Sequence, residues 1–183
     1  MSIPFLPPNR PRLTREKAER LLEKHGVKPS EMDPAVMLLG VRGYYHDDHG
    51  DNQRGVYDDA IFLLTPTAFV AFNANTDPSA FRHGIASLKP GRYLYKLGIH
   101  GLSKPKDRQY EALVQAGEVT VCRDGGEVET GWFGINIHRG GASGTSSLGC
   151  QTIPPAQWES FISMVRAELK RHGQKTIPYI LTT

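Results

Sequence analysis

A histidine and a cysteine lie twelve positions apart in a segment made mostly of small residues. His138 and Cys150 belong to the stretch INIHRGGASGTSSLGCQTIP, in which Gly, Ser, Thr and Ala separate them almost completely. A thiol is a poor nucleophile until it is deprotonated, and a histidine within hydrogen-bonding reach can take its proton. A strand that ends at His138, followed by a loop that returns to Cys150, would allow this contact. The pattern therefore predicts a cysteine nucleophile with its own base.

Two further residues of this segment are candidates for supporting roles. Gly149 permits a sharp backbone path beside the nucleophile, so that amide N–H groups near Gly149 and Cys150 can stabilise an oxyanion. Ser147 is placed to orient His138 through its side-chain or carbonyl oxygen, and the sequence does not choose between these atoms. We therefore expect a catalytic set of Cys150, His138, Ser147 and Gly149. The alternative is a flexible surface loop that merely contains a cysteine and follows a core histidine.

The end of the segment resembles the active site of the YkuD-type L,D-transpeptidases. The usual pattern of that family is His-Gly, an intervening loop and Ser-x-Gly-Cys, which His138 and the residues SLGC at 147–150 match. The chain departs from the pattern at Arg139, where the family commonly has glycine. It departs again at Gln151 and Thr152, where an apolar residue and Arg or Asn are usual, and its connecting loop is somewhat short.

The whole chain is also similar to a group of phage and prophage proteins that share GYY, YDDA, FNANTDPS, RDG and GINIHRGG followed by SSLGCQT. The YkuD-type resemblance implies a β-rich catalytic domain that attacks a peptidoglycan peptide stem after a diamino acid and forms a cysteine acyl-enzyme. An amine acceptor gives transpeptidation, and water gives cleavage by a carboxypeptidase or an endopeptidase. The implied partners are peptidoglycan peptide stems, and no cofactor is expected.

Three arginines and a tyrosine are candidates for contacts with the substrate. Arg42, Arg123 and Arg139 can bind substrate carboxylates through paired guanidinium hydrogen bonds. Arg139 is favoured because it directly follows His138, whereas Arg42 and Arg123 can equally be strand ends with structural ion pairs. Tyr44 can add an aromatic contact, for which ordinary core packing is the competing interpretation.

A rival cluster of polar residues lies between positions 44 and 59. Its potential metal ligands are His46, Asp47, Asp48, His49, Asp51, Asp58 and Asp59. Because the calcium-loop pattern and the HExxH zinc helix are both absent, we expect a polar surface loop and no metal site. A divalent-metal hydrolase that uses this cluster, with His100 as a further ligand, stays open as an alternative. A non-enzymatic wall-binding or virion module is the third possibility.

Composition is that of an ordinary soluble globular protein. The 183 residues suffice for one domain, and the hydrophobic and charged contents are 39% and 22%. The formal net charge of +3 is spread without a Lys/Arg block, so we expect no nucleic-acid partner. Cys122 and Cys150 belong to no CxxC pair, so we expect free thiols, with Cys122 in a buried structural role. The oligomeric state is not indicated.

The sequence contains no signal for export or membrane insertion. The first residues lack the basic start and apolar run of a secretory signal, and no segment reaches the roughly 18 apolar residues that span a bilayer. We expect synthesis in the cytoplasm and no stable membrane insertion. An enzyme of peptidoglycan would then act in the cell wall or periplasm after delivery or lysis.

The elements that must position these residues are mostly strands. We expect an N-terminal extension over residues 1–13 and a single domain over 14–183. Thr14 can cap a helix that stops near Gly26, and a helix with one apolar face is expected over 156–173. The segments with strand patterns are 37–41, 60–64, 68–72, 92–100, 118–124, 131–138 and 176–182.

The order of these elements indicates the fold class. Strands do not alternate regularly with helices, as they would in a doubly wound parallel sheet. We therefore expect an antiparallel-rich α+β fold: a single β-rich YkuD-like domain with an N-terminal helix and a helix after the catalytic cysteine.

Overall fold

The computed structural model describes residues 13–28, 35–45 and 52–183, which contain two α-helices and eleven strands. The helices are α1 (Arg15–Lys24) and α2 (Pro155–Arg171), and a short 3-10 helix, η2, spans Lys106–Arg108. The strands are β1 (Met37–Val41), β2 (Asp59–Leu64), β3 (Phe69–Ala74), β4 (Ala86–Leu88), β5 (Gly91–His100), β6 (Tyr110–Gln115), β7 (Val119–Arg123), β8 (Val128–Gly131), β9 (Ile137–Arg139), β10 (Gln151–Ile153) and β11 (Ile177–Thr182).

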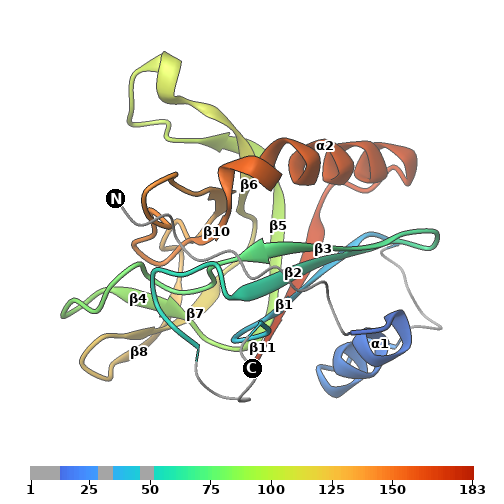
Figure 1. The fold of residues 1–183 in the computed structure, drawn as a ribbon, viewed down its shortest axis with the longest axis horizontal. Coiled ribbons are helices and arrows are strands. Elements are labelled where there is room, and N and C mark those ends of the chain that lie inside the picture. Colours follow the sequence, from blue (N-terminus) through green and yellow to red (C-terminus); the bar gives the residue numbers. More distant parts are fainter. Residues whose placement is uncertain (1–12, 29–34, 46–51) are drawn as a thin grey trace.

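The strands form one large sheet and one small sheet (Figure 1). The large sheet has eight strands in the order β10-β9-β6-β5-β11-β1-β2-β3, and the small one has the order β4-β7-β8. Neighbouring strands are antiparallel except for β1 with β11 and β9 with β10. Beyond the last residue of β3, Asn75 exchanges two backbone hydrogen bonds of 2.8 Å with Thr152 of β10. The large sheet therefore curls until its two edges meet.

Strands β1 and β2 are buried on both faces. Leu38 and Ile61 belong to the core that α2 covers, whereas Leu39 and Phe62 belong to the core that α1 covers. This division follows from the two-residue period of a strand, whose successive side chains point to opposite faces. Figure 1 accordingly shows α1 and α2 on opposite sides of these strands.

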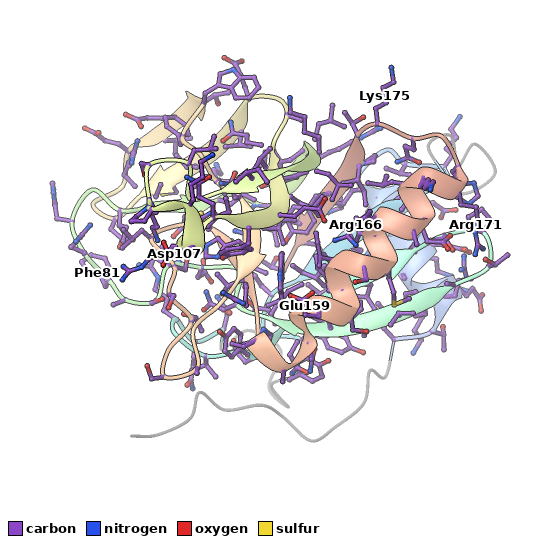
Figure 2. All side chains as sticks on the ribbon, turned by 90° about the horizontal axis from the view of Figure 1, so that it is seen from above. Phe81, Asp107, Glu159, Arg166, Arg171 and Lys175 are labelled. Atoms are coloured by element: carbon purple, nitrogen blue, oxygen red, sulfur yellow. The ribbon has the colours of Figure 1, made fainter. Side chains whose placement is uncertain are left out.

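Helix α2 is amphipathic in the way that its sequence predicts. Its inner face buries Trp158, Phe161, Ile162, Val165 and Leu169 in the main core. Its outer surface carries charged side chains, among them Glu159, Arg166 and Arg171 (Figure 2). None of the helices in the described ranges is long and apolar enough to cross a membrane.

The structure confirms the α+β class and most of the expected elements. Thr14 caps α1 by accepting a hydrogen bond from Lys17 N, and the two expected strands β2 and β3 form an antiparallel hairpin. Both cysteines are free, as expected, but the expected burial of Cys122 is wrong, since its side chain is partly exposed. Pro178 is the second residue of β11, which lies between β5 and β1.

The expected strand over 131–138 is wrong. Strand β8 ends at Gly131, and β9 begins only at Ile137. Between them, the N–H groups of Phe133 and Ile135 donate to the side-chain oxygen of Gln115, at 3.3 and 3.1 Å, rather than to a neighbouring strand. Gln115 therefore interrupts the ladder just before the segment that carries His138.

Candidate active site

The loop between β9 and β10 is held by neighbouring segments at several points. The Tyr57 hydroxyl donates to the carbonyl oxygen of Gly141 at 3.0 Å. Ser79 Oγ lies 2.6 Å from Thr145 Oγ1 and accepts a hydrogen bond of 2.7 Å from Ser147 N. Thr145 and Ser147 are both buried. These contacts are those of a packed loop and not of the flexible surface loop considered as an alternative.

Cys150 directly precedes β10 and is partly exposed. The parallel ladder pairs Gln151 with Ile137, which sets Cys150 beside Asn136. The Cys150 Sγ accepts a hydrogen bond from Asn136 N at 3.4 Å and lies 3.5 Å from the carbonyl oxygen of Gly134. Burial raises the pKa of the thiol, and the Asn136 N–H opposes this with a smaller effect. The resting side chain is therefore a neutral thiol, which needs a base before it can attack.

His138 is buried in β9, with 5% of its surface exposed. Its Nδ1 lies 2.8 Å from the carbonyl oxygen of Arg139. Because a carbonyl oxygen only accepts, this contact assigns the proton to Nδ1 and leaves Nε2 with a free lone pair. The Tyr110 hydroxyl lies 3.3 Å from the same Nδ1.

The surroundings of His138 keep its imidazole neutral. The ring of His100 stacks on it, with ring centroids 4.1 Å apart and an angle of 19° between the planes. Burial and the neighbouring His100 lower the pKa of His138 to about 4, although its hydrogen bond to Arg139 acts in the other direction. At neutral pH the side chain is therefore an uncharged imidazole that can accept a proton.

His138 lies in β9 and Cys150 directly before the neighbouring strand β10, and the two side chains share no hydrogen bond. The register pairs His138 with Thr152, two residues beyond the cysteine. The hydrogen-bond contacts of Sγ among the described residues are with Asn136 and Gly134. Proton transfer to His138 therefore requires the thiol to turn away from these partners, or a water molecule to bridge the two side chains.

Ser147 holds the turn before Cys150 and does not orient His138. Its hydroxyl donates to the Cys150 carbonyl oxygen at 2.6 Å and accepts from Gly149 N at 3.0 Å. Its own carbonyl oxygen accepts from Ser79 N at 2.9 Å. The expected contact between Ser147 and His138 is therefore wrong, because both oxygens of Ser147 are engaged elsewhere.

Gly149 occupies a position that only glycine can take. Its φ is +131°, and a Cβ atom added there would lie 2.4 Å from the carbonyl oxygen of Ala86. The Gly149 N–H is used by Ser147, so it is not the free oxyanion donor that the sequence suggested. The Cys150 N–H has no hydrogen-bond partner among the described residues and is the amide left for that role.

Two of the candidate arginines lie near these residues. Arg139 is exposed, and its guanidinium carbon lies 4.8 Å from the centre of the Tyr110 ring. Arg123 extends from β7 over the Phe133 ring at 5.1 Å and pairs with Glu129 through an N–O distance of 2.7 Å. Arg139 thus has the exposed position that a substrate contact requires, whereas Arg123 forms the structural ion pair given as its alternative.

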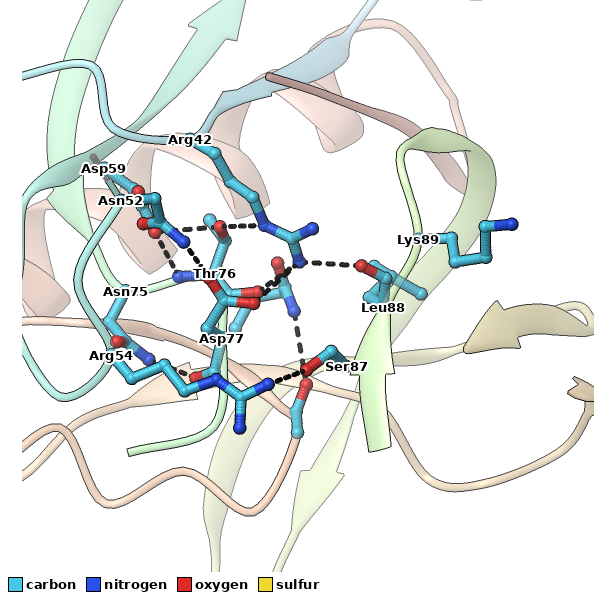
Figure 3. A network of polar contacts seen from close by, with 12 residues as sticks. Arg42, Asn52, Arg54, Asp59, Asn75, Thr76, Asp77, Ser87, Leu88 and Lys89 are labelled. Carbon is cyan, nitrogen blue, oxygen red and sulfur yellow. Dashed lines mark hydrogen bonds and ion pairs between the residues drawn. The ribbon is translucent and has the colours of Figure 1, made fainter. Parts of the chain in front are cut away.

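Arg42 belongs to a buried structural network instead (Figure 3). Its guanidinium donates to the carbonyl oxygens of Thr76 and Leu88, at 2.8 and 2.7 Å. It also forms an ion pair of 3.2 Å with Asp77, and both side chains are at most 11% exposed. The expected role of Arg42 in substrate binding is wrong, since its donors already join β1, β4 and the segment after β3.

Tyr44 also has a structural position. Its ring packs edge-on against Tyr45 and Phe62, with centroids 5.1 and 5.2 Å away, next to the core under α1. Its hydroxyl accepts a hydrogen bond from Leu13 N at 2.6 Å. The expected contact of Tyr44 with substrate is therefore wrong, and the competing interpretation of core packing is correct.

The rival metal cluster is only partly within the described residues. His46, Asp47, Asp48, His49 and Asp51 lie outside them. Asp59 accepts hydrogen bonds from Gly43 N and from the N–H and hydroxyl of Thr76, at 2.6 to 2.8 Å. Burial and the neighbouring Asp58 raise the pKa of Asp59 to about 7. Over the ranges that the structure describes, no three His, Cys, Asp or Glu side chains form a metal-binding group.

Three residues of the site had not been assigned to it from the sequence. The Asn136 side chain accepts from Gln115 N at 3.2 Å, and its Nδ2 lies 3.4 Å from His100 Nδ1. Asn136 could have been found, because residues two apart on a strand share a face and it stands two before His138. His100 and Tyr110 come from β5 and β6, where they pair with each other. No local pattern connects these two strands to the His-Cys segment.

Comparisons of the chain with protein-family models, with curated proteins and with solved structures find no match.

Proposed function

We propose that the chain is a cysteine-dependent enzyme that acts on the peptide stems of peptidoglycan through an acyl-enzyme, in a YkuD-like domain. The observation that supports it is the parallel pairing of β9 with β10, which sets the Cys150 thiol and the buried His138 on adjacent strands. The Arg139 carbonyl oxygen fixes the proton on Nδ1 of His138, so that the basic Nε2 is available. The Ser-x-Gly-Cys and His positions are those that the family resemblance assigns to nucleophile and base.

The proposed reaction begins with two neutral side chains. His138 Nε2 takes the thiol proton as Cys150 Sγ attacks the carbonyl carbon of the scissile amide. The Cys150 N–H stabilises the oxyanion of the tetrahedral intermediate. When the C–N bond breaks, the imidazolium returns its proton to the leaving amine, and a thioester remains. An acceptor amine then gives a new cross-link, or water gives a free carboxylate.

The site of action in this proposal is the bacterial wall or the periplasm, reached by delivery or lysis in the context of a phage. The departures at Arg139, Gln151 and Thr152 directly follow the proposed base and nucleophile in the sequence, so the resemblance does not identify the acceptor. We therefore leave transpeptidation and cleavage as two outcomes that one assay separates.

Mass spectrometry of defined muropeptides tests this proposal. Wild-type protein should convert a stem peptide to a shortened or cross-linked product, and a protein adduct of acyl mass should appear on Cys150. Cys150→Ala should abolish both signals. Cys122→Ala is the matched control, because it removes the other free thiol, and it should keep them. Full turnover by folded Cys150→Ala refutes the proposal, and turnover that only a chelator abolishes favours a metal-dependent hydrolase.

A further inference from the structure

Two histidine rings are stacked at the candidate site, and only one of them is the proposed base. His100 is the last residue of β5 and His138 lies in β9, with β6 between these strands in the sheet. Strands two apart in a sheet are separated by about 10 Å. The ring centroids are nevertheless 4.1 Å apart, with an angle of 19° between the planes. The side chains therefore reach toward each other over β6, and the charge of one ring acts directly on the other.

The side chain of Asn136 determines which nitrogen of His100 carries the proton. Asn136 Oδ1 accepts a hydrogen bond of 3.2 Å from Gln115 N, and Asn136 Nδ2 lies 3.4 Å from His100 Nδ1. Because an amide nitrogen only donates, His100 Nδ1 accepts, and the proton of the neutral ring is on Nε2. His138 has the opposite tautomer, with its proton on Nδ1. The two stacked rings thus have different hydrogen-bonding roles.

A proton on His100 would conflict with this arrangement at two points. The charged ring carries a proton on Nδ1, which faces the side-chain N–H group of Asn136, so that a donor meets a donor. It also sets a positive charge against the ring of His138, which then resists becoming charged itself. Two neutral rings have neither conflict. The structure is therefore that of the neutral pair.

The groups around His100 supply no negative charge. Burial, and then the ammonium group of Lys104 in the loop between β5 and η2, lower the pKa of His100. From β6, the Tyr110 ring lies 5.4 Å from that of His100, and burial raises the pKa of its hydroxyl. From β9, the cationic Arg139 covers the other side of Tyr110 at 4.8 Å, and the Cys150 thiol is neutral at rest. No Asp or Glu in the described ranges forms an ion pair with either ring.

His100 is the ring that takes a proton first as the pH falls. His138 is 5% exposed, and burial is the main reason that its pKa is lowered to about 4. His100 is partly exposed, so that less desolvation opposes its charged form. The first proton bound by the pair is therefore on the ring that is not the proposed base.

We propose that His100 is a proton-operated switch of the Cys150 site: the neutral ring lets His138 take the thiol proton, and the charged ring prevents it. In the proposed reaction the proton moves from Cys150 Sγ to His138 Nε2, which creates an imidazolium stacked on His100. Only a neutral His100 tolerates that charge. His100 acts through His138 and is a positioning residue. The inference rests on the proposed function and adds a regulation to it, by which mild acid turns the site off.

NMR titration of the two rings tests the switch without a substrate. In the wild type His100 should take its proton first, and ¹⁵N shifts at neutral pH should show protons on His100 Nε2 and His138 Nδ1. His100→Phe keeps an aromatic ring over His138 without a charge. In this variant the His138 midpoint should rise by about one pH unit, a tenfold gain in proton affinity. Lys104→Gln is the matched control and should move the midpoint far less, because Lys104 contributes least to the lowered pKa of His138.

Each of these measurements can overturn the inference. A His138 ring that protonates before His100 contradicts the order on which the switch depends. A His138 midpoint that is the same in wild type and His100→Phe removes the coupling of the rings. A proton on His100 Nδ1 at neutral pH removes the contact with Asn136. The first and third readouts use the wild type alone, so they stand even where a variant does not fold.

The pH dependence of muropeptide turnover separates the switch from the proposed function. The acid limit of cysteine-dependent turnover should lie at the midpoint of His100 in the wild type and about one pH unit lower in His100→Phe. An unchanged limit overturns the switch and leaves the proposed function standing. Absence of turnover in the wild type, with the expected NMR result, overturns the proposed function and keeps the coupled pair of rings.

Discussion

Acidification should destabilise the protein through His138. The pKa of this histidine is about 4 in the folded protein, against an ordinary value of 6.5, mainly because the ring is buried. Between these two values the unfolded chain binds a proton that the folded protein excludes. The free energy of unfolding therefore rises with pH across this window, and the contribution is lost as pH falls from 6.5 toward 4.

The size of the effect follows from the same two values. A difference from 6.5 to about 4 corresponds to about 3 kcal/mol, at about 1.4 kcal/mol for each pKa unit. The loss should reach about 2 kcal/mol at pH 5 and about 3 kcal/mol at pH 4. Asp59 acts in the opposite direction, because its raised pKa lets the folded protein keep a proton that the unfolded chain releases. The contribution of His138 must therefore be taken as a difference between variants.

Urea unfolding of wild type and His138→Gln between pH 4 and pH 7.5 measures that difference. The wild type should lose about 3 kcal/mol more than the variant on going from neutral pH to pH 4. His83→Gln, at an exposed histidine, is the matched control and should follow the wild type. NMR titration of the His138 ring gives a second measurement, independent of whether the variant folds. A His138 ring that protonates near pH 6.5 refutes the lowered pKa of the buried imidazole.

Three further predictions concern the turn before the cysteine and the buried carboxyl. Gly149→Ala should lower the free energy of unfolding by more than about 2 kcal/mol, since the added Cβ meets a carbonyl oxygen at 2.4 Å at a φ of +131°. Gly144→Ala is the control and should change urea unfolding little, because no atom lies within 4 Å of its added Cβ. Equal losses of stability in the two variants contradict the steric cause. Ser147→Ala should lower the free energy of unfolding by about 1–3 kcal/mol and slow the alkylation of Cys150, because two hydrogen bonds of the turn are lost. An unchanged alkylation rate, measured by mass spectrometry, argues against this role of Ser147. The stability of the wild type should fall as the pH rises from about 4 to about 7, because the folded carboxyl of Asp59, with a pKa of about 7, keeps a proton that the unfolded one has released. Asp59→Asn should remove this fall. Urea-derived stabilities of variant and wild type that run parallel over this pH range contradict the prediction.

Local patterns in the sequence were sufficient for the helices and the hairpin. The apolar face of α2 and the Thr14 cap of α1 depend on residues three or four apart, and β2 and β3 are joined by a short turn. Strands β9 and β10 have three residues each, too few for a periodic pattern. The break before β9 depends on Gln115, which stands 18 and 20 residues before the N–H groups that it binds. Such long-range contacts leave no local signal.

The same distinction separates the correct and incorrect parts of the candidate site. His138 and Cys150 could be named because residue type and spacing suggested their chemistry. The role of Ser147 was wrong because its hydroxyl bonds within the turn, to Cys150 O and Gly149 N, and its backbone is held by Ser79, 68 residues earlier in the chain. Arg42 was wrong because Leu88, 46 residues away, takes part of its hydrogen-bonding capacity. A short motif indicates which side chains can react, but partners far along the chain decide where they point.

The closure of the large sheet restricts how an extended peptide can bind beside Cys150. Strand β10 is paired with β9 on one side, and on the other side Thr152 exchanges hydrogen bonds with Asn75. Many peptide-binding proteins capture an extended chain as an additional strand on a free sheet edge. That mode is blocked directly after Cys150, so a peptide that binds at the proposed site would have to be recognised through its side chains and charged ends. The same pairing prevents unrelated extended polypeptides from adding as a strand beside Thr152.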